Sequence, residues 1–323
     1  MNNILVLGGS GFVGRSVCDK LVERSNGAGG RITVPSRKPA RAKHLQMLPT
    51  LQLVEADVHD PAQLRALVEG VDAVVNLVAI LHGSEAAFER AHVALPRTLV
   101  AACAAAGVRR VVHVSALGIS DSNEPGAPAA PSLYLRSKTA GEAVLRAAAL
   151  DLTLLRPSVI FGEHDRFLNL FATLQSVFPI MPLAGAQARF QPVWVQDVAQ
   201  AIVACLDRPD SIGQTYECAG PQVLTLRQIV EAAGRWSGNA RRVIGLPEGL
   251  ARLQAGMMER LPGETLMSRD NVASMRVPNV ATGRWPGLTA LGITPASMEA
   301  VVPGYLSAHQ GIARLDRWRA QRP

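Results

Sequence analysis

The chain has 323 residues, 48 % of them hydrophobic, which suits one large globular domain or two closely joined ones. Its longest apolar segments, such as residues 73–81, fall short of the ~20 residues that a membrane span requires. The first apolar run leads into a glycine turn instead of a signal-peptide cleavage site, so we expect a cytoplasmic protein. The four cysteines are widely spaced and form no CxxC pair, which predicts neither a disulfide nor a metal site.

The net charge of +7 is concentrated near the C-terminus, because residues 235–323 contain 12 Arg and only 6 Asp or Glu. A solvated basic surface is the simplest interpretation. The alternative is an acidic partner: a membrane surface, an anionic substrate or another protein. We expect no nucleic-acid partner, since the sequence has no basic patch interleaved with aromatic residues.

The N-terminal run Ile4–Leu7 ends in glycines at positions 8, 11 and 14, which predicts a buried strand, a tight turn and the start of a helix. The first turn of a helix presents unpaired backbone N–H groups and the positive end of the helix dipole, so it can bind a phosphate. We expect Gly8 to allow the turn, Gly11 to let a pyrophosphate approach the main chain and Gly14 to let the helix pack closely. The segment Gly8–Gly14 is therefore a predicted dinucleotide site.

Alternating strand and helix patterns follow, as in an α/β protein with a Rossmann-type doubly wound parallel sheet. Five more apolar runs bring the predicted strands to six: Arg31–Pro35, Leu51–Glu55, Asp72–Ala79, Arg110–Ser115 and Leu152–Arg156. Helical patterns between them cover Pro61–Glu69, Glu85–Gly107 and Tyr134–Ala149.

In such a sheet the ligand binds at the carboxyl ends of the strands. The predicted cofactor-binding residues are Gly8, Ser10, Gly11, Phe12, Val13, Gly14, Ser36, Arg37, Lys38, Asp57, Val58, Leu77, Val78, Ala79, Ser115, Tyr134, Lys138, Pro157 and Val159. We expect Asp57, after the third strand, either to accept the adenine amino group or to cap the turn before Pro61.

The loop after the second strand carries cations and no acid. An NAD-specific protein usually offers an acidic residue here to the ribose hydroxyls, but no Asp or Glu occurs between Arg24 and Val54. Arg37 can hold a 2′-phosphate with paired N–H donors, while Lys38 can add a charge and Ser36 a hydroxyl. We expect NADP(H) as the preferred cofactor, with NAD(H) as the second choice. The competing interpretation is an ordinary basic loop.

Tyr134 and Lys138 are four residues apart, so they share one face of the helix predicted after the fifth strand. A nearby ammonium lowers the pKa of a phenol, which lets a tyrosine serve as an acid or base near neutral pH. We predict Tyr134 as the proton donor and Lys138 as the residue that binds ribose and tunes the tyrosine. The competing interpretation is a helix start with a packed tyrosine and a solvated lysine.

A family resemblance rests on residues 8–14 (GGSGFVG), Tyr134 with Lys138, residues 155–162 (LRPSVIFG) and residues 193–199 (VWVQDVA). With these the chain resembles an extended or atypical short-chain dehydrogenase/reductase of the NAD-dependent epimerase/dehydratase group. Further segments resemble the nucleotide-binding accessory subunit of respiratory complex I and its bacterial relatives: residues 113–118 (HVSALG), 268–272 (SRDNV), 291–292 (LG) and 302–306 (VPGYL). The resemblance implies that the glycine motif holds NADP(H) and that the C-terminal half supplies a smaller domain.

Two departures from this group bear on the reaction. Its enzymes usually have a run of Ser or Thr after the fifth strand, whereas here Ser115 is followed by Ala116, Leu117 and Gly118. His92 stands where the group commonly has an Asn. Ser115, predicted as the third catalytic residue, or Ser120 is left to donate a hydrogen bond to the substrate. We therefore expect reduction of an apolar carbonyl or quinone-like compound in preference to sugar-nucleotide chemistry.

The second half of the chain returns once to the sheet, with helical patterns over Arg166–Phe178 and Gln196–Leu206 and a late strand over Thr215–Ala219. We assign residues 1–157 and about 193–219 to the NADP-binding Rossmann domain, and about 158–192 and 220–323 to a smaller lobe for substrate or partner.

Within that lobe one helical segment has an apolar stripe, which consists of Leu246, Leu250, Leu253, Met257 and Leu261, flanked by Arg252, Glu259 and Arg260. We expect a helix that faces the core. The alternatives are a membrane-surface helix or a lid over a hydrophobic substrate, with support from the basic tail residues Arg314, Arg317, Arg319 and Arg322.

These patterns lead to three hypotheses. The first is an NADP(H)-dependent oxidoreductase. The second is a nucleotide-holding accessory or assembly protein of the respiratory chain or of quinone synthesis, with a structural cofactor, a respiratory-chain partner and a peripheral position at the inner face of the membrane. The third and weakest is a sugar-nucleotide epimerase or dehydratase, which needs NAD and the missing hydroxyl groups.

Overall fold

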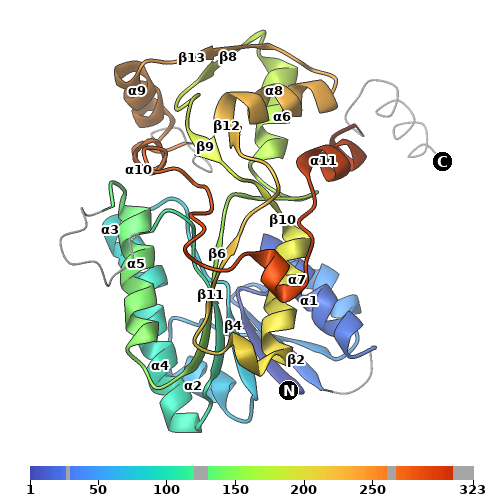
Figure 1. The fold of residues 1–323 in the computed structure, drawn as a ribbon. Helices are drawn as coiled ribbons and strands as arrows, with labels where there is room; N and C mark the ends of the chain where they lie inside the picture. The colour runs from blue at the N-terminus through green and yellow to red at the C-terminus, as the bar shows by residue number, and fades with distance from the viewer. Residues whose placement is uncertain (27–29, 120–129, 260–266, 308–323) are drawn as a thin grey trace. The chain divides into compact units, whose positions relative to one another are not determined.

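The computed structural model describes residues 1–26, 30–119, 130–259 and 267–307, which form two compact units (Figure 1). Unit 1 consists of Met1–Pro157, Val195–Cys218 and Thr282–Thr294, and unit 2 consists of Ser158–Trp194, Ala219–Ala281 and the chain from Pro295 onward. The sequence pattern predicted residues 282–294 in the smaller lobe, whereas they belong to unit 1. Glu217 holds that segment to unit 1, because its carboxylate accepts the backbone N–H groups of Thr282 and Gly283 at 2.9 Å each.

The central sheet of unit 1 has seven parallel strands in the order β11, β6, β5, β4, β1, β2, β3. Their bounds are β1 Asn3–Leu7, β2 Arg31–Ser36, β3 Leu51–Glu55, β4 Ala73–Asn76, β5 Arg110–Val114, β6 Asp151–Pro157 and β11 Thr215–Cys218. The sequence predicted six, and β11, expected only as a late strand, is the seventh because it pairs with β6. Strand order reverses where β1 lies between β4 and β2, so the crevice for a ligand is expected at the carboxyl end of β1.

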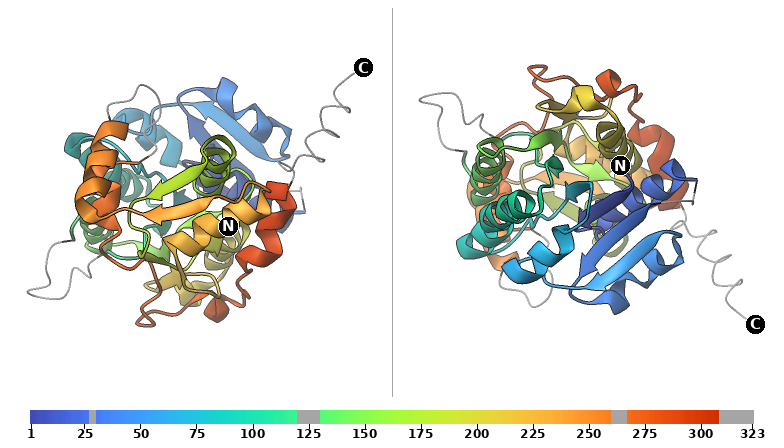
Figure 2. Two further views of the ribbon diagram at one scale, coloured as in Figure 1. Left: turned by 90° about the horizontal axis from the view of Figure 1, so that it is seen from above. Right: turned by 90° about the horizontal axis from the view of Figure 1, so that it is seen from below.

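Helices cover both faces of this sheet (Figure 2), which explains why its central strands are apolar on both sides. On one face α1 (Phe12–Arg24) packs against α7 (Val195–Asp207). On the other face lie α2 (Pro61–Val68), α4 (Leu95–Ala106) and α5 (Leu133–Arg146). The helical segment that leads into α4 begins with α3 (Glu85–Glu89) and continues through a π-helical turn, η2 (Arg90–Ala94). Short 3-10 turns are η1 (Pro39–Met47), η3 (Pro209–Ser211) and η4 (Leu288–Leu291).

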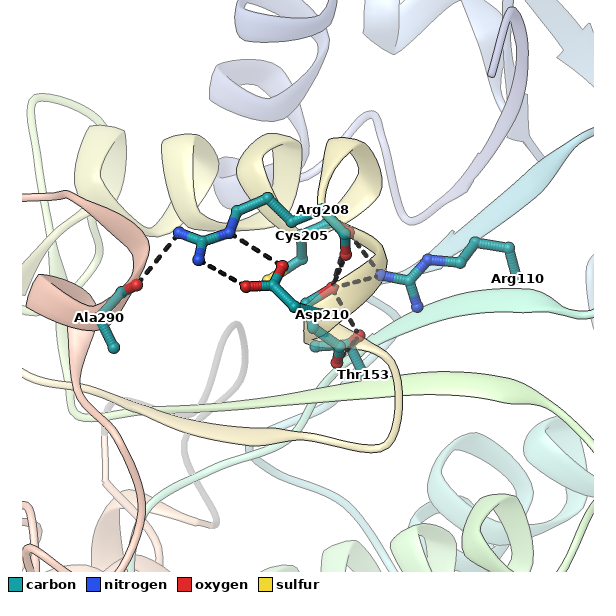
Figure 3. Close-up of polar contacts among 7 residues, drawn as sticks. Arg110, Thr153, Cys205, Arg208, Asp210 and Ala290 are labelled. Atoms are coloured by element: carbon teal, nitrogen blue, oxygen red, sulfur yellow. Dashed lines mark hydrogen bonds and ion pairs between the residues drawn. The ribbon is translucent and has the colours of Figure 1, made fainter.

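A buried arginine, Arg110 at the start of β5, connects the sheet to α7 by hydrogen bonds (Figure 3). The Arg110 guanidinium donates to the carbonyl oxygens of Asp151 and Cys205, at 2.6 Å each, and to Ser211 Oγ at 3.0 Å. Its burial lowers its pKa. Nearby, Arg208 donates to Asp210 and to the carbonyl oxygen of Ala290 in η4, which holds the 282–294 segment to unit 1 a second time.

Unit 2 is built from five helices in its described residues: α6 (Leu168–Val177), α8 (Leu226–Trp236), α9 (Glu248–Met258), α10 (Arg269–Ser274) and α11 (Met298–Leu306). Three two-stranded ladders accompany them: β7 (Ile160–Phe161) with β10 (Val193–Trp194), β9 (Arg189–Phe190) with β12 (Leu224–Thr225), and β8 (Ile180–Leu183) with β13 (Arg242–Gly245). Its main core joins α6, α8 and α11 around side chains such as Phe171, Ile229 and Val302.

Helix α9 does not bury the predicted apolar stripe. Ala251 and Ala255 face the core at 2 % and 0 % exposure, whereas Leu250, Leu253 and Met257 are 54 %, 61 % and 64 % exposed. The expectation of a core-facing stripe is therefore wrong for these three residues, because the helix packs through its small alanines, whereas Leu246, which precedes α9, packs against the same core. Leu261 and the four tail arginines lie outside the described residues. Of the helices that the structure describes, none has the length and apolar character to cross a bilayer.

Candidate functional site

The glycine turn joins β1 to α1 in unit 1. Gly8 has φ +80°, a left-handed conformation that side chains disfavour, as predicted. A Cβ on Gly14 would overlap Gly8 O and lie 2.5 Å from Gly9 Cα, so Gly14 lets the helix start directly against the turn. A Cβ on Gly11 would meet only Gly8 O, at 3.2 Å, which leaves its other side open for a ligand. Gly11 is also the N-cap of α1 and offers no side chain to the first-turn N–H groups.

The turn contains a fourth glycine whose role the spacing did not reveal. A Cβ on Gly9 would lie 2.8 Å from Val34 Cγ1 on β2. Gly9 therefore lets β2 approach the turn, and this contact between distant segments has no signal in the local sequence.

The carboxyl end of β2 presents the predicted 2′-phosphate residues. Ser36 is the last residue of β2, and its Oγ accepts the backbone N–H of Lys38 at 3.3 Å. Arg37 and Lys38 are both exposed. Glu55, the next acidic residue along the chain, is the β3 neighbour of Ser36 in the sheet register and is exposed as well.

Asp57 acts as a turn cap in the structure. Its Oδ1 accepts the backbone N–H of His59 at 3.0 Å, and its Oδ2 lies 3.4 Å from Arg90 Nη2. Of the two expectations for Asp57, the geometry favours the cap, and an adenine contact stays a prediction. Burial and the nearby Arg90 lower the pKa of His59. Arg90, which contacts Asp57 from the π-helical turn, was not predicted from the sequence.

The loop after β4 is held by three hydrogen bonds that its backbone N–H groups donate. Leu77 N–H donates to Leu7 O at 2.9 Å, Val78 N–H to Asn76 Oδ1 at 3.1 Å, and Ile80 N–H to His92 Nε2 at 3.1 Å. Because β1 and β4 are parallel neighbours, this loop ends beside the glycine turn, and Leu77 lies directly against Gly8.

Helix α5 carries the predicted catalytic pair, and Ser132 caps its N-terminus by accepting the Leu135 N–H at 3.2 Å. Lys138 is 2 % exposed, and its Nζ donates to Val114 O at the end of β5 at 2.8 Å. The Tyr134 ring lies edge-on to Phe88 and His92, at centroid distances of 6.3 and 5.6 Å. The lysine is therefore not solvated, which removes that part of the competing interpretation.

Ser115 follows β5 directly. Its backbone N–H donates to Leu155 O at 2.7 Å, and its Oγ is buried without a hydrogen-bond partner among the described residues. Buried hydroxyls normally find a partner, and none is present in the part of the chain that the structure describes, so the role of Ser115 Oγ in contacting a ligand stays a prediction. Leu117 is buried and donates its N–H to Pro157 O at 2.9 Å. Ser120 lies outside the described residues.

The electrostatics of the pair differ from expectation. Burial raises the pKa of Tyr134 to about 12, so the prediction that a nearby cation lowers this pKa is wrong. Burial also lowers the pKa of Lys138 to about 8, although Glu142 opposes the shift. An i, i+4 spacing predicts neighbouring side chains and says nothing about desolvation, which dominates both shifts. The phenol therefore keeps its proton at neutral pH, as a proton donor must.

The structure brings most of the predicted residues to one edge of the unit 1 sheet. Five adjacent parallel strands, β1 to β5, carry at or just after their carboxyl ends the glycine turn, Ser36, Asp57, Leu77 and Ser115. Val159 is different, because it belongs to unit 2, where its N–H donates to Asn279 Oδ1 at 2.8 Å. Its role in cofactor binding stays a prediction. Of the described residues, no group of three or more His, Cys, Asp or Glu is placed to hold a metal ion.

A parallel doubly wound sheet with an uncapped, glycine-lined helix start at its switch point defines a Rossmann-type dinucleotide-binding protein. A family model described as NAD(P)H-binding matches residues 8–209, and the chain belongs to this family.

The relatives include subunits of mitochondrial NADH dehydrogenase and reductases. NADH dehydrogenase [ubiquinone] 1 alpha subcomplex subunit 9, mitochondrial, of Rattus norvegicus is 32 % identical over 324 residues, covering 97 % of this chain and 81 % of the relative. Ceramide reductase of Caulobacter vibrioides is 27 % identical over 247 residues, covering 76 % and 74 %. Among solved structures, dTDP-glucose 4,6-dehydratase from Streptomyces venezuelae, with NAD and TYD bound, has a TM-score of 0.70 at 24 % identity, covering 99 % of this chain and 98 % of that chain. This likeness shows the shared fold.

Proposed function

We propose that the protein is an NADP(H)-dependent oxidoreductase of the short-chain dehydrogenase/reductase type that acts on an apolar carbonyl or quinone-related compound. The observation that carries the proposal is the group at the end of β5 and the start of α5: Tyr134, whose pKa is raised by burial, a buried Lys138 and the orphaned hydroxyl of Ser115. The names of reductases among the relatives support this reaction class.

The residues of this group have distinct roles in the proposed reaction. NADP(H), when bound, supplies the hydride. Tyr134 donates its phenolic proton to the carbonyl oxygen of the substrate, and Ser115 Oγ donates a hydrogen bond to the same oxygen. Lys138 keeps its position through Val114 O, and in this proposal its other N–H groups bind ribose hydroxyls. The apolar Leu117 next to this group favours an apolar substrate.

Cofactor choice should depend on Arg37. We expect the wild-type protein to bind NADPH more tightly than NADH, and Arg37→Ala to weaken NADPH binding by about ten- to hundred-fold with little effect on NADH, since one charged hydrogen-bonding partner contributes about 1.5–3 kcal/mol. Isothermal titration calorimetry of both cofactors measures this.

Arg41→Ala is the matched control, because Arg41 is an exposed arginine in the same acid-free stretch and lies in η1 rather than at the strand end. Equal weakening of both cofactors by Arg37→Ala would refute the assignment. A wild-type preference for NADH would assign the ribose hydroxyls to Glu55 instead.

A second candidate is a nucleotide-holding accessory or assembly protein of the respiratory chain or of quinone synthesis. The observation in its favour is the similarity to the complex I subunits, which extends over nearly the whole chain. In this candidate the nucleotide is structural, and the Tyr134 proton is never transferred. Both candidates require the glycine turn, so only the chemistry at Tyr134 separates them.

The exposed face of α9 favours a peripheral position for either candidate. We expect the protein to sediment with vesicles that contain anionic lipid at low salt and to be released at high salt, because attraction between polybasic segments and the surface is screened over about 10 Å at 0.1 M. Leu253→Glu should prevent sedimentation, whereas Met47→Glu, at an 88 % exposed position of unit 1, should not. Failure of the wild type to sediment at low salt would leave the stripe without a membrane role.

A further inference from the structure

One imidazole lies between the loop after β4 and the helix that carries Tyr134. His92 is 3 % exposed, and its Nε2 accepts the Ile80 N–H at 3.1 Å. A ring nitrogen that accepts a hydrogen bond carries no proton, so the neutral ring must hold its proton on Nδ1. That Nδ1 lies 2.8 Å from Ser137 Oγ. Burial and the neighbouring Lys138 lower the pKa of His92 to about 3, which keeps the ring neutral.

Ser137 continues the connection into α5. Its Oγ accepts from His92 Nδ1 and donates to the carbonyl oxygen of Tyr134 at 2.9 Å. Each group in this series therefore donates to the next: the Ile80 N–H to His92, His92 to Ser137, and Ser137 to the main chain of Tyr134. The His92 ring also meets the Tyr134 ring edge-on, at an interplanar angle of 80°.

The backbone around His92 is shaped for this contact. His92 lies in the π-helical turn η2, and such turns widen a helix locally and often mark functional sites. Gly141 of α5 packs against the His92 carbonyl, where a Cβ would overlap the oxygen. Two independent contacts, one through the side chain and one through the main chain, thus hold η2 to α5.

We propose that His92 is a positioning residue that fixes the loop after β4 relative to Tyr134 through a directional chain of hydrogen bonds, Ile80 N–H to Nε2 and Nδ1–H to Ser137. The effect of this positioning on catalysis rests on the proposed function, because the loop after β4 contains the predicted cofactor residues Leu77, Val78 and Ala79. The hydrogen bonds from Ile80 through His92 to Ser137 do not depend on a nucleotide. An experiment can therefore refute this proposal without refuting the proposed function, and the reverse.

The first test is the tautomer of His92, measured by 15N NMR on the full chain without nucleotide. We expect one signal pair with the proton on Nδ1, unchanged between pH 5 and 8. Ser137→Ala removes the acceptor of that proton and should change the Nδ1 chemical shift while the protein stays folded. A proton on Nε2, or a ring that titrates near pH 6.5, would overturn the proposal.

The second test is hydrogen exchange at the Ile80 amide. His92→Phe should speed this exchange by about ten-fold or more, since the amide loses its acceptor. His92→Gln, whose amide oxygen can accept the same N–H, should restore part of the protection. His44→Phe, at an exposed position in η1, is the control and should leave the exchange unchanged. Unchanged exchange at Ile80 in His92→Phe would also overturn the proposal.

A third readout, with NADPH added, separates positioning from folding. We expect His92→Phe to weaken NADPH binding by about ten-fold and Ser137→Ala to weaken it less, because Ser137→Ala breaks the link to α5 but keeps the bond from the Ile80 N–H to His92 Nε2. If the wild type fails to bind NADPH, the proposed function is wrong while the tautomer and exchange results still decide the hydrogen-bond chain. Equal weakening by both variants would contradict a role of His92 specific to the loop.

Discussion

Replacing Gly14 with alanine should abolish nucleotide binding. The added Cβ would overlap Gly8 O and lie 2.5 Å from Gly9 Cα. These are backbone atoms, which cannot move aside as a flexible side chain can, so the turn must open. Loss of two charge-assisted contacts from the first turn of α1 to a pyrophosphate would weaken binding by about 10²- to 10⁴-fold. Overpacking should also cost about 1–3 kcal/mol of unfolding free energy. Calorimetric titration with NADPH and chemical denaturation measure the two effects.

Gly249→Ala is the matched control. Gly249 lies in α9, and a Cβ there would meet no atom within 4 Å. Alanine is the better helix former, so this variant should be as stable as the wild type or slightly more stable, with unchanged nucleotide affinity. If Gly14→Ala binds NADPH as well as Gly249→Ala does, the glycine turn is not the nucleotide site.

Replacing Tyr134 with phenylalanine should remove most turnover and leave nucleotide affinity nearly unchanged. Phenylalanine keeps the ring contacts to Phe88 and His92 and lacks the phenolic hydroxyl group that donates the proton. General acid catalysis of this kind contributes about 10²- to 10⁴-fold, which sets the expected loss. The measurement is NADPH oxidation at 340 nm with a panel of apolar aldehydes, ketones and quinones.

The control for this variant is Tyr216→Phe, since Tyr216 is a buried tyrosine of β11 that has no predicted role in the reaction. It should keep its turnover. A wild-type protein that binds NADPH but oxidises it with none of these compounds, or a Tyr134→Phe variant with full turnover, would contradict the proposed chemistry.

The fold was largely predictable because its signals are local. Strands β1, β3 and β5 read as short apolar runs, and the glycines at 8, 11 and 14 mark the turn between β1 and α1. Strand β11 was harder to place, since its partner β6 lies about 60 residues earlier in the chain and no local pattern specifies that pairing. The segment 282–294 was misassigned for the same reason, because it is held by long-range bonds to Glu217.

In the candidate site, too, the features that could be predicted are local in sequence and those that could not depend on distant segments. The residue types at Arg37, Tyr134 and Lys138 were visible in the sequence, whereas Gly9, Arg90 and the contacts of His92 depend on distant segments. The spacing of residues in the sequence could not predict how deeply their side chains are buried. Burial reversed the expected pKa shift of Tyr134. In α9 the alanines face inward and the large apolar side chains face the surface, which a periodic stripe alone does not determine.

The most direct test of catalysis, the central claim, is complementation of a deletion strain by Tyr134→Phe and by Gly11→Val, side by side with the wild type. Gly11→Val places a bulky side chain where the pyrophosphate would approach, so it should empty the site and fail to complement. We predict that Tyr134→Phe, which keeps its nucleotide, also fails. Full rescue by Tyr134→Phe together with failure of Gly11→Val would contradict an enzymatic role and leave the nucleotide as a structural ligand.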